Sequence, residues 1–285
     1  MKKLHPLLTV LFLIYWGCED SMDNEKSFIE FTNLFGGGGD DGGFSVEQTT
    51  DGGYIITGYT WSYGNGEEDI WLIKTDGQGN EEWYQTFGGS EDDEGLYVEQ
   101  TMDGGYIITG YLSNDENNYD VRLIKTDGQG NEEWNRTFGG GIGYSVKQTT
   151  DGGYVITGGT QSFVSGGSDS DVWLIKTDSQ GNEEWNQTFG GGGGYSVKQT
   201  NDGGYVVIGG TDSEENVWLI KTDSQGDEEW NQTYGGGEDD HGYSGEQTTD
   251  GGYIITGSTQ SYSNGRYDVY LIKTDPNGNT EPYED

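Results

Sequence analysis

Short apolar stretches recur along the chain, as at 154–157 and 172–177, and turns rich in glycine and aspartate separate them. Apolar residues fill consecutive positions in these stretches rather than alternate ones. Strands that are covered on both faces show this pattern. The Asp-Gly pairs between the stretches favour tight hairpins, because they tolerate the positive φ that such turns need. The pattern therefore predicts short antiparallel strands packed on both faces.

One unit is repeated five times with a spacing of 45 to 52 residues: Asp-Gly-Gly-Tyr begins each copy's second strand, and Leu-Ile-Lys-Thr-Asp marks its third. In the third copy the predicted strands are 144–149, 154–157, 172–177 and 184–189. A unit of this length suits a four-stranded propeller blade. We expect an all-β fold, a five-bladed β-propeller of four-stranded antiparallel blades over residues 27–285. A linear β-solenoid is the alternative.

The two ends of the repeated region complement each other. The fifth copy stops after its third strand, whereas Phe31 and Phe35, before the first copy, align with the Trp and Phe of a fourth strand. The N-terminal strand is therefore expected to complete the last blade and close the ring. A closed ring leaves no free sheet edge.

Residues 1–17 combine two lysines with an apolar run and predict a secretory signal peptide. The Gly-Cys pair that ends at Cys18 resembles a bacterial lipoprotein signal, in which the cysteine carries the lipid. Residues 18–26 would form an acidic tether, similar to the surface-export signal of Bacteroidetes lipoproteins. The resemblance implies an exported cell-envelope protein, at the outer membrane or cell surface, that meets the membrane only through its lipid. Ordinary secretion with an incidental Cys18 is the alternative.

Composition excludes several classes of function. The formal net charge of −38 disfavours nucleic acids and anionic membranes as partners. The chain has one cysteine, so intrachain disulfides and cysteine-based metal sites are excluded. Beyond the signal peptide His241 is the only histidine, which argues against a multi-histidine metal centre and leaves a Ser-His-Asp triad without support.

The segment 75–83, Thr-Asp-x-x-Gly-Asn-x-x-Trp, is similar to the blade signature of quinoprotein-like propellers. The repeats as a whole resemble the tandem repeats of secreted bacterial and archaeal proteins of propeller type, over residues 28–280. These resemblances imply that the Trp docks between adjacent blades. Quinone dehydrogenases of that type have eight blades and a cofactor pocket, which five blades without a matching ligand set do not fit. No cofactor is expected to be required.

Residues that recur in every copy are interpreted as structural. The repeated Lys-Thr-Asp, as at Lys74 and Asp76, is expected to make polar pairs within a blade, and 76–82 is expected to be a hairpin turn rather than a calcium loop. Alternating strand directions place these turns at one end of each blade. The variable loops lie at the other end, where binding loops on a rigid scaffold are expected. Every departure from the repeat is predicted to fall there.

Two sets of residues are candidates at that variable end. The acids of the interblade loops are candidate calcium ligands, with simple solvation as the alternative: Asp40, Asp41, Glu91, Asp92, Asp93, Glu94, Glu238, Asp239 and Asp240. The aromatic residues of the loops between strands two and three are a candidate stacking platform, with loop packing as the alternative: Trp61, Tyr63, Tyr119, Phe163, Tyr262 and Tyr267.

The sequence favours a monomeric, non-catalytic binding or adhesion module whose partner is an extracellular glycan or a cell-surface protein. The alternative is a carbohydrate-active enzyme, similar to a glycoside hydrolase, that uses paired carboxylates at the variable end.

Overall fold

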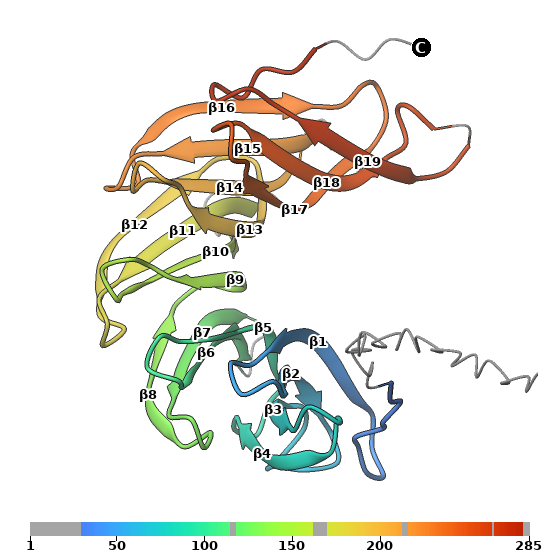
Figure 1. Ribbon diagram of the computed structural model, residues 1–285, viewed down its shortest axis with the longest axis vertical. Coiled ribbons are helices and arrows are strands. Elements are labelled where there is room, and N and C mark those ends of the chain that lie inside the picture. The colour runs from blue at the N-terminus through green and yellow to red at the C-terminus, as the bar shows by residue number, and fades with distance from the viewer. Residues whose placement is uncertain (1–29, 115–117, 162–169, 213–215, 264, 282–285) are drawn as a thin grey trace, which may run out of the picture. The chain divides into compact units, whose positions relative to one another are not determined.

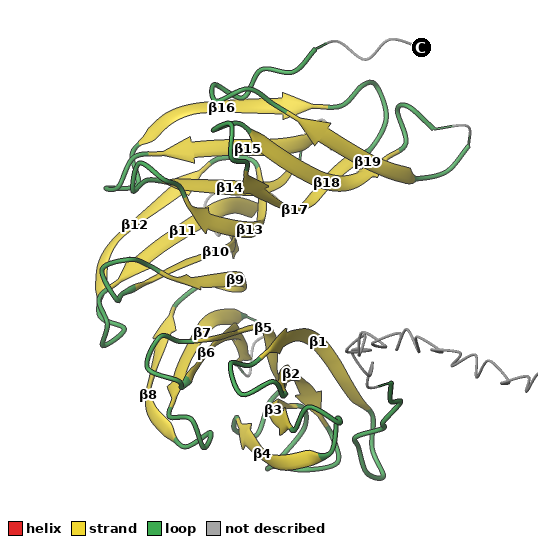
Figure 2. Ribbon diagram, in the orientation of Figure 1, coloured by secondary structure: helices red, strands yellow, loops and turns green. Residues whose placement is uncertain are grey.

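The computed structural model describes residues 30–114, 118–161, 170–212, 216–263 and 265–281, in which all regular structure is β-strand (Figure 2). Contacts divide the chain into units 1–30 and 31–285, and the second unit contains all the strands. The predicted signal peptide, Cys18 and the tether lie outside the described residues. Among the described residues no helix has the length and apolarity that a membrane crossing needs.

The described strands form five antiparallel sheets, in which each strand is hydrogen-bonded to its neighbours in sequence (Figure 1). Sheets 1 to 4 have four strands each and sheet 5 has three. Sheet 1 is β1 (Asp41–Gln48), β2 (Tyr54–Thr60), β3 (Asp69–Thr75) and β4 (Glu81–Phe87); sheet 2 is β5 (Asp93–Gln100), β6 (Tyr106–Ser113), β7 (Tyr119–Thr126) and β8 (Glu132–Phe138); sheet 3 is β9 (Gly141–Gln148), β10 (Tyr154–Gln161), β11 (Ser170–Thr177) and β12 (Glu183–Phe189); sheet 4 is β13 (Gly192–Gln199), β14 (Tyr205–Thr211), β15 (Val217–Thr222) and β16 (Glu228–Tyr234); sheet 5 is β17 (Asp240–Gln247), β18 (Tyr253–Thr259) and β19 (Asp268–Lys273).

The predicted strands of the third copy are confirmed, and so is the missing fourth strand of the fifth copy. The main difference is that the first strand begins three residues earlier than 144, inside the glycine run. The pairing of β9 with β10 shifts register between Thr157 and Gly158, so the early residues continue the strand beyond a bulge.

Apolar side chains of consecutive sheets pack against each other and form the core. Between sheets 2 and 3, for example, Ile107 and Leu123 meet Val146 and Ile156, and all four are buried. Equivalent clusters join sheets 1 and 2, sheets 3 and 4, and sheets 4 and 5. The prediction that strands are covered on both faces is therefore confirmed for sheets 2, 3 and 4.

An aromatic pair recurs at every junction. Trp83 of sheet 1 packs on Tyr106 of sheet 2 with ring centroids 5.8 Å apart. A Cβ on Gly130 would lie 2.5 Å from the Trp83 ring, and Gly130 also has a φ of +79°. Glycine is therefore required at this turn both for its backbone conformation and for the space that the Trp occupies. The docking that the quinoprotein-like resemblance implied is observed.

The segment before sheet 1 imitates this junction. The Phe31 ring lies 5.8 Å from the Tyr54 ring, and a Cβ on Gly79 would lie 2.4 Å from Phe31. Asn33 also donates to the Gly79 carbonyl at 2.5 Å. Phe31 thus takes the position on sheet 1 that the fourth-strand Trp takes on each later sheet, as its sequence alignment predicted.

The outer faces of the first and last sheets are uncovered. Leu271 of β19 is 67% exposed, whereas its counterpart Leu219 in sheet 4 is fully buried. Val46 of β1 is 64% exposed, whereas its counterpart Val98 in sheet 2 is 1% exposed. Within the described residues β19 is hydrogen-bonded only to β18. A closed ring is therefore not observed in the structure.

A buried lysine joins the third strand of each complete sheet to the fourth strand and to the turn before the second strand. In sheet 2, Lys125 Nζ lies 3.0 Å from Asp103 Oδ2 and 2.9 Å from Glu133 Oε2, and it donates to the Thr126 carbonyl at 2.8 Å. A bulge between β7 and β8 leaves Glu133 out of the strand pairing, which lets it reach the lysine. The predicted pairing of the repeated lysine within a blade is confirmed.

The turn after this lysine is also as predicted. Asp76 Oδ1 accepts hydrogen bonds from the backbone N–H groups of Gln78 and Asn80, at 2.8 and 2.9 Å. Asn80 Nδ2 donates to Asp76 Oδ2 at 2.9 Å. The aspartate thus holds the hairpin turn itself, as an Asx turn does.

Replacing Lys125 by Met should lower the free energy of unfolding by about 1–3 kcal/mol, because a buried carbonyl and two carboxylates lose a charged donor. Lys273→Met is the matched control. Its side chain is 44% exposed and its only carboxylate partner among the described residues is Asp250, since sheet 5 has no fourth strand. That variant should lose less than about 1 kcal/mol. Urea unfolding measures both, and equal losses would contradict the structural role of the buried lysine.

Candidate functional site

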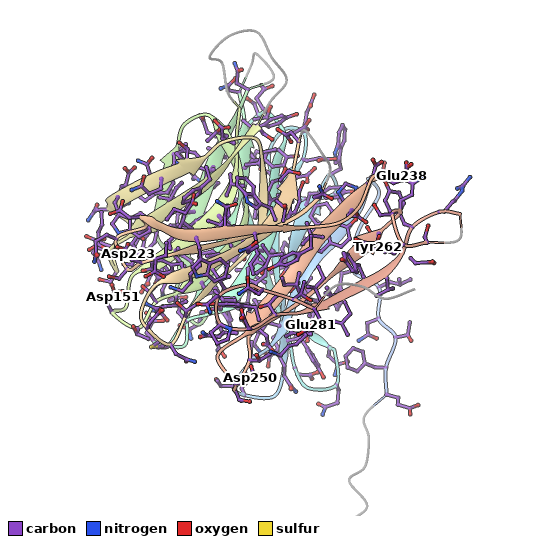
Figure 3. All side chains as sticks on the ribbon, turned by 90° about the horizontal axis from the view of Figure 1, so that it is seen from above. Asp151, Asp223, Glu238, Asp250, Tyr262 and Glu281 are labelled. Carbon is purple, nitrogen blue, oxygen red and sulfur yellow. The ribbon has the colours of Figure 1, made fainter. Side chains whose placement is uncertain are left out.

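The two ends of each sheet differ, as predicted. At one end the two hairpin turns touch: a Cβ on Gly77 would lie 3.0 Å from the Gly52 carbonyl oxygen. At the other end, here called the loop end, the interblade loop binds the loop after the second strand; for example, Ser113 N donates to the Asp92 carbonyl at 2.9 Å. Figure 3 shows Glu238 and Tyr262 at the loop end of sheet 5, with Asp250 at its other end.

The prediction that every departure from the repeat falls at the loop end is wrong. Arg122 stands on β7 where sheets 1, 3 and 4 have a Trp. One position of the first strand also varies in charge: it is a glutamate in sheets 1, 2 and 5 and a lysine in sheets 3 and 4, as Glu47, Glu99, Lys147, Lys198 and Glu246. These side chains lie between neighbouring first strands, which sequence reasoning about loops did not consider. The charge difference was visible in the sequence as Val-Glu-Gln against Val-Lys-Gln.

The most unusual chemistry at the loop end lies between sheets 1 and 2. Six acidic residues meet there, two at the start of β5, one just before it, and three around the start of β3. We call this group the acid cluster: Glu67, Glu68, Asp69, Asp92, Asp93 and Glu94. Three of its members are among the acids singled out in the sequence, and Glu67, Glu68 and Asp69 were missed. These three residues lead into an apolar strand, and from the sequence alone they resemble an ordinary solvated turn.

Two carboxyl groups of the acid cluster are buried side by side. Asp69 and Asp93 are each 2% exposed, and a Cβ on Gly88 would lie 2.0 Å from Asp69 Oδ1 and 2.7 Å from Asp93 Oδ2. Asp93 Oδ2 accepts a hydrogen bond from Gly89 N at 2.8 Å. Burial, with the nearby Asp69 charge, raises the pKa of Asp93 to about 6. Burial also raises the pKa of Asp69.

Glu94 is the second carboxyl of the cluster with a strongly raised pKa. Burial and the neighbouring Glu68 carboxyl raise the pKa of Glu94 to about 7, although the Tyr111 hydroxyl opposes this. Tyr111 packs edge-on against Tyr119 with centroids 4.8 Å apart. At neutral pH the cluster thus holds a carboxyl that retains its proton for much of the time, beside carboxylates and tyrosine hydroxyls. Perturbed acids in such a setting are candidates for function.

The other candidate calcium ligands have different surroundings. Asp41 accepts a hydrogen bond from Ser62 Oγ, in the loop after β2, at 2.6 Å. Asp240 accepts from Gly236 N at 2.9 Å and from Ser261 Oγ at 2.7 Å. The Asp40, Glu91, Glu238 and Asp239 side chains lie in the same kind of loop and are exposed or half-buried. Within the described ranges, no group of three or more His, Cys, Asp or Glu side chains has the arrangement of a metal site.

The candidate aromatic residues do not form one platform. Tyr63 packs on Trp71 and Tyr84, with centroids 5.6 and 5.2 Å away. Tyr262 packs on Tyr270 and donates to the Gly235 carbonyl at 2.7 Å, and Tyr267 donates to Asp239 Oδ2 at 3.0 Å. Trp61 and Tyr267 are exposed, whereas Tyr119 packs beside the acid cluster. Phe163 lies outside the described residues.

No protein-family model matches the chain, and neither does any curated protein sequence. Solved structures do. A protein of unknown function from Bacteroides caccae is 12% identical, with 76% of this chain and 90% of that chain covered and a TM-score of 0.45. A β-xylosidase, RS223, is 11% identical, with 84% and 94% covered and a TM-score of 0.45. Sqt1 from Chaetomium thermophilum is 10% identical, with 82% and 62% covered and a TM-score of 0.43. None of these likenesses carries an activity over to this chain.

Glu94→Gln should stabilise the protein at pH 8 and change its stability little at pH 4. The folded chain holds the Glu94 proton up to about pH 7, whereas an unfolded chain releases it near pH 4. Between these values the folded state binds more protons, so Glu94 makes stability fall as pH rises, and Gln removes that fall. Thermal unfolding at both pH values measures the effect. Glu238→Gln, an equal change of charge at an exposed site, is the control. An equal gain at both pH values would contradict the raised pKa.

Proposed function

We propose that this chain is an exported, non-catalytic ligand-binding or adhesion module that acts through the loop end of its sheets. The observation that supports this most is the acid cluster, because similar sheets hold it in place while its side chains differ from those at every other junction. Function on a rigid scaffold is typically placed in such loops.

The chemistry of the cluster fits a neutral glycan better than an anionic ligand. Ionised carboxylates accept hydrogen bonds from sugar hydroxyls, while a protonated Glu94 and the Tyr111 hydroxyl supply donors. The exposed Trp61 ring on sheet 1 offers a face on which a sugar ring can stack. A cell-surface protein with a basic or hydroxyl-rich patch is the second kind of partner that this surface would fit.

One observation favours an enzyme as the second candidate. A carboxyl with a pKa of about 7 beside ionised carboxylates has the division of roles that glycoside hydrolysis needs. Glu94 would donate its proton to the glycosidic oxygen. Glu68 or Asp92 would then activate the water molecule that attacks the sugar, and the bond to the leaving group would break.

A panel of neutral polysaccharides separates the two candidates. The module predicts saturable binding without any release of reducing sugar, weakened at least tenfold by Glu94→Gln combined with Asp92→Asn. The enzyme predicts reducing sugar at a rate that Glu94→Gln lowers by at least a hundredfold while binding persists. Glu238→Gln is the control for both. If no polysaccharide binds and none is cleaved, the role of the loop end in glycan recognition is wrong.

The proposal extends to the fold: the five sheets close into a monomeric ring, with residues 30–35 beside β19. Phe31 already sits on sheet 1 as a fourth-strand Trp would, so its strand belongs next to a third strand. Closure would bury Leu271 and Val269, and each apolar side chain removed from water contributes about 1.5–3 kcal/mol.

Thiol labelling tests closure. A chain that starts at residue 27 has no cysteine, so Leu271→Cys introduces a single thiol. Asn201→Cys, at an exposed turn, is the reference. A closed ring predicts that Cys at 271 reacts at least tenfold more slowly than Cys at 201 in the folded protein, and equally fast in urea. Equal rates in the folded protein would show that the face of sheet 5 is open.

The remaining expectations stay predictions. Lipid attachment at Cys18 and a position at the outer membrane or cell surface follow from residues outside the described ranges. Calcium binding by the acidic loops would add a bridging cation to carboxylates that otherwise repel each other.

A further inference from the structure

Glutamate side chains cap the free edges of the first strands. Each first strand is hydrogen-bonded on one side only, to the second strand of its sheet, so alternate N–H groups point away from the sheet. Gln100 N donates to Glu47 Oε2 of the preceding sheet at 2.7 Å. Gln148 N donates in the same way to Glu99 Oε1 at 3.2 Å. A carboxylate therefore satisfies the edge at the first two junctions.

At the next two junctions the same position is a lysine. Lys147 of sheet 3 takes this position next to β13 of sheet 4, and Lys198 of sheet 4 takes it next to β17 of sheet 5. In the turn of sheet 5, Thr248 N donates to the Gly252 carbonyl, so the Thr248 N–H points toward the second strand. Since successive N–H groups along a strand point to opposite sides, the N–H of Gln247 points to the free edge, as that of Gln100 does. No carboxylate of the described chain accepts from it. An ammonium and an N–H, both donors, thus occur at a place where the repeat puts an acceptor.

The two lysines are not equivalent. Lys147 is paired with Glu99 and lies 4.9 Å from the centre of the Tyr97 ring. Lys198 has no carboxylate within 4.0 Å among the described residues, although the chain has 51 acids against 13 Lys and Arg. Burial and the adjacent Lys147 ammonium lower the pKa of Lys198. The Glu99 and Glu246 charges oppose this lowering without cancelling it, so an external anion would stabilise the half-buried cation further.

A cavity adjoins Lys198. Its volume is about 170 Å³, and Ser244, Glu246 and Thr256 are among the residues that line it with Lys198. Gly245 stands there in place of the valine found in the other four first strands, and Ile208 of sheet 4 comes within 3.3 Å of where its Cβ would be. The cavity is open to solvent, so a small organic acid can enter it.

We propose that Lys198 and the N–H of Gln247 bind the carboxylate of a small acidic ligand, in the place that Glu47 and Glu99 fill at the earlier junctions. One carboxylate oxygen would accept from the N–H and the other from the ammonium, a charge-assisted arrangement. Lys147 adds a second positive charge nearby, and the Ser244 hydroxyl lines the same cavity. Uronic acids and other small carboxylic acids have this chemistry. The site is separate from the acid cluster at the loop end, so it does not depend on the ligand proposed there; ring closure, by contrast, would cover the side of the cavity that Leu271 lines.

Titration of the full-length protein in detergent solution with sodium glucuronate, at constant ionic strength, tests the proposal. Backbone NMR should show a saturable shift of the Gln247 amide, and the melting temperature should rise by mass action. Glucose at the same concentration should do neither. Lys198→Met should weaken binding at least tenfold, and so should Lys198→Glu, which restores the repeat's own carboxylate and fills the place of the ligand. Arg266→Met removes one exposed positive charge and should bind as the unchanged protein does.

Two results would overturn the proposal. Equal Gln247 shifts in the unchanged protein and in Lys198→Met would show that the lysine only balances the charges of Glu99 and Glu246. Saturation by phosphate with no response to glucuronate would show that the site does not select a carboxylate. If Lys198→Met fails to fold, Lys198→Glu decides alone, because glutamate is the residue that three other sheets carry at this position.

Discussion

Each sheet is apolar on both faces, and no repeat can cover both faces from within itself. Burial therefore depends on the next sheet, and the same junction is built four times. The Trp of one sheet, the Tyr of the next and the glycine that makes room between them are the fixed parts of that junction. The conformation of single turns follows from it, since Gly130 is required partly by Trp83. Sheets 1 and 5 each lack a neighbouring sheet on one face, so apolar side chains on that face remain exposed.

Charge is distributed around this constraint. The repeated lysines lie inside the sheets, while their carboxylate partners remain about half exposed. The chain thus keeps a large negative charge on its surface without burying unpaired acids at most junctions. Between sheets 1 and 2 it does bury two carboxyls together, and no lysine of the described residues forms an ion pair with either. Burial and the nearby Asp69 charge raise the pKa of Asp93 to about 6, so this pair takes up a proton more readily than exposed carboxylates do.

Repetition made much of the fold predictable from the sequence. Strands, hairpin turns, the lysine pairs and the missing fourth strand were all correct, because each depends on residues close in the chain and is repeated in every copy. The acid cluster was only half predicted. Asp69 and Asp93 are distant in sequence, and their contact exists only after two sheets have packed. The role of the Glu and Lys residues on the first strands was missed for the same reason, since each of these side chains acts on the neighbouring sheet and not on its own.

Because the junctions resemble one another, the number of repeats can change during evolution. Sheets 2, 3 and 4 present similar faces to the sheets before them, because Val98, Val146 and Val197 meet their preceding sheets in the same way. A recombination event that removes or adds one whole repeat therefore joins two compatible faces, wherever it occurs. An event that cuts within a repeat leaves a lysine without its acids and a Trp without its Tyr. Selection on such a gene would tolerate the gain or loss of whole repeats far more readily than the gain or loss of part of a repeat.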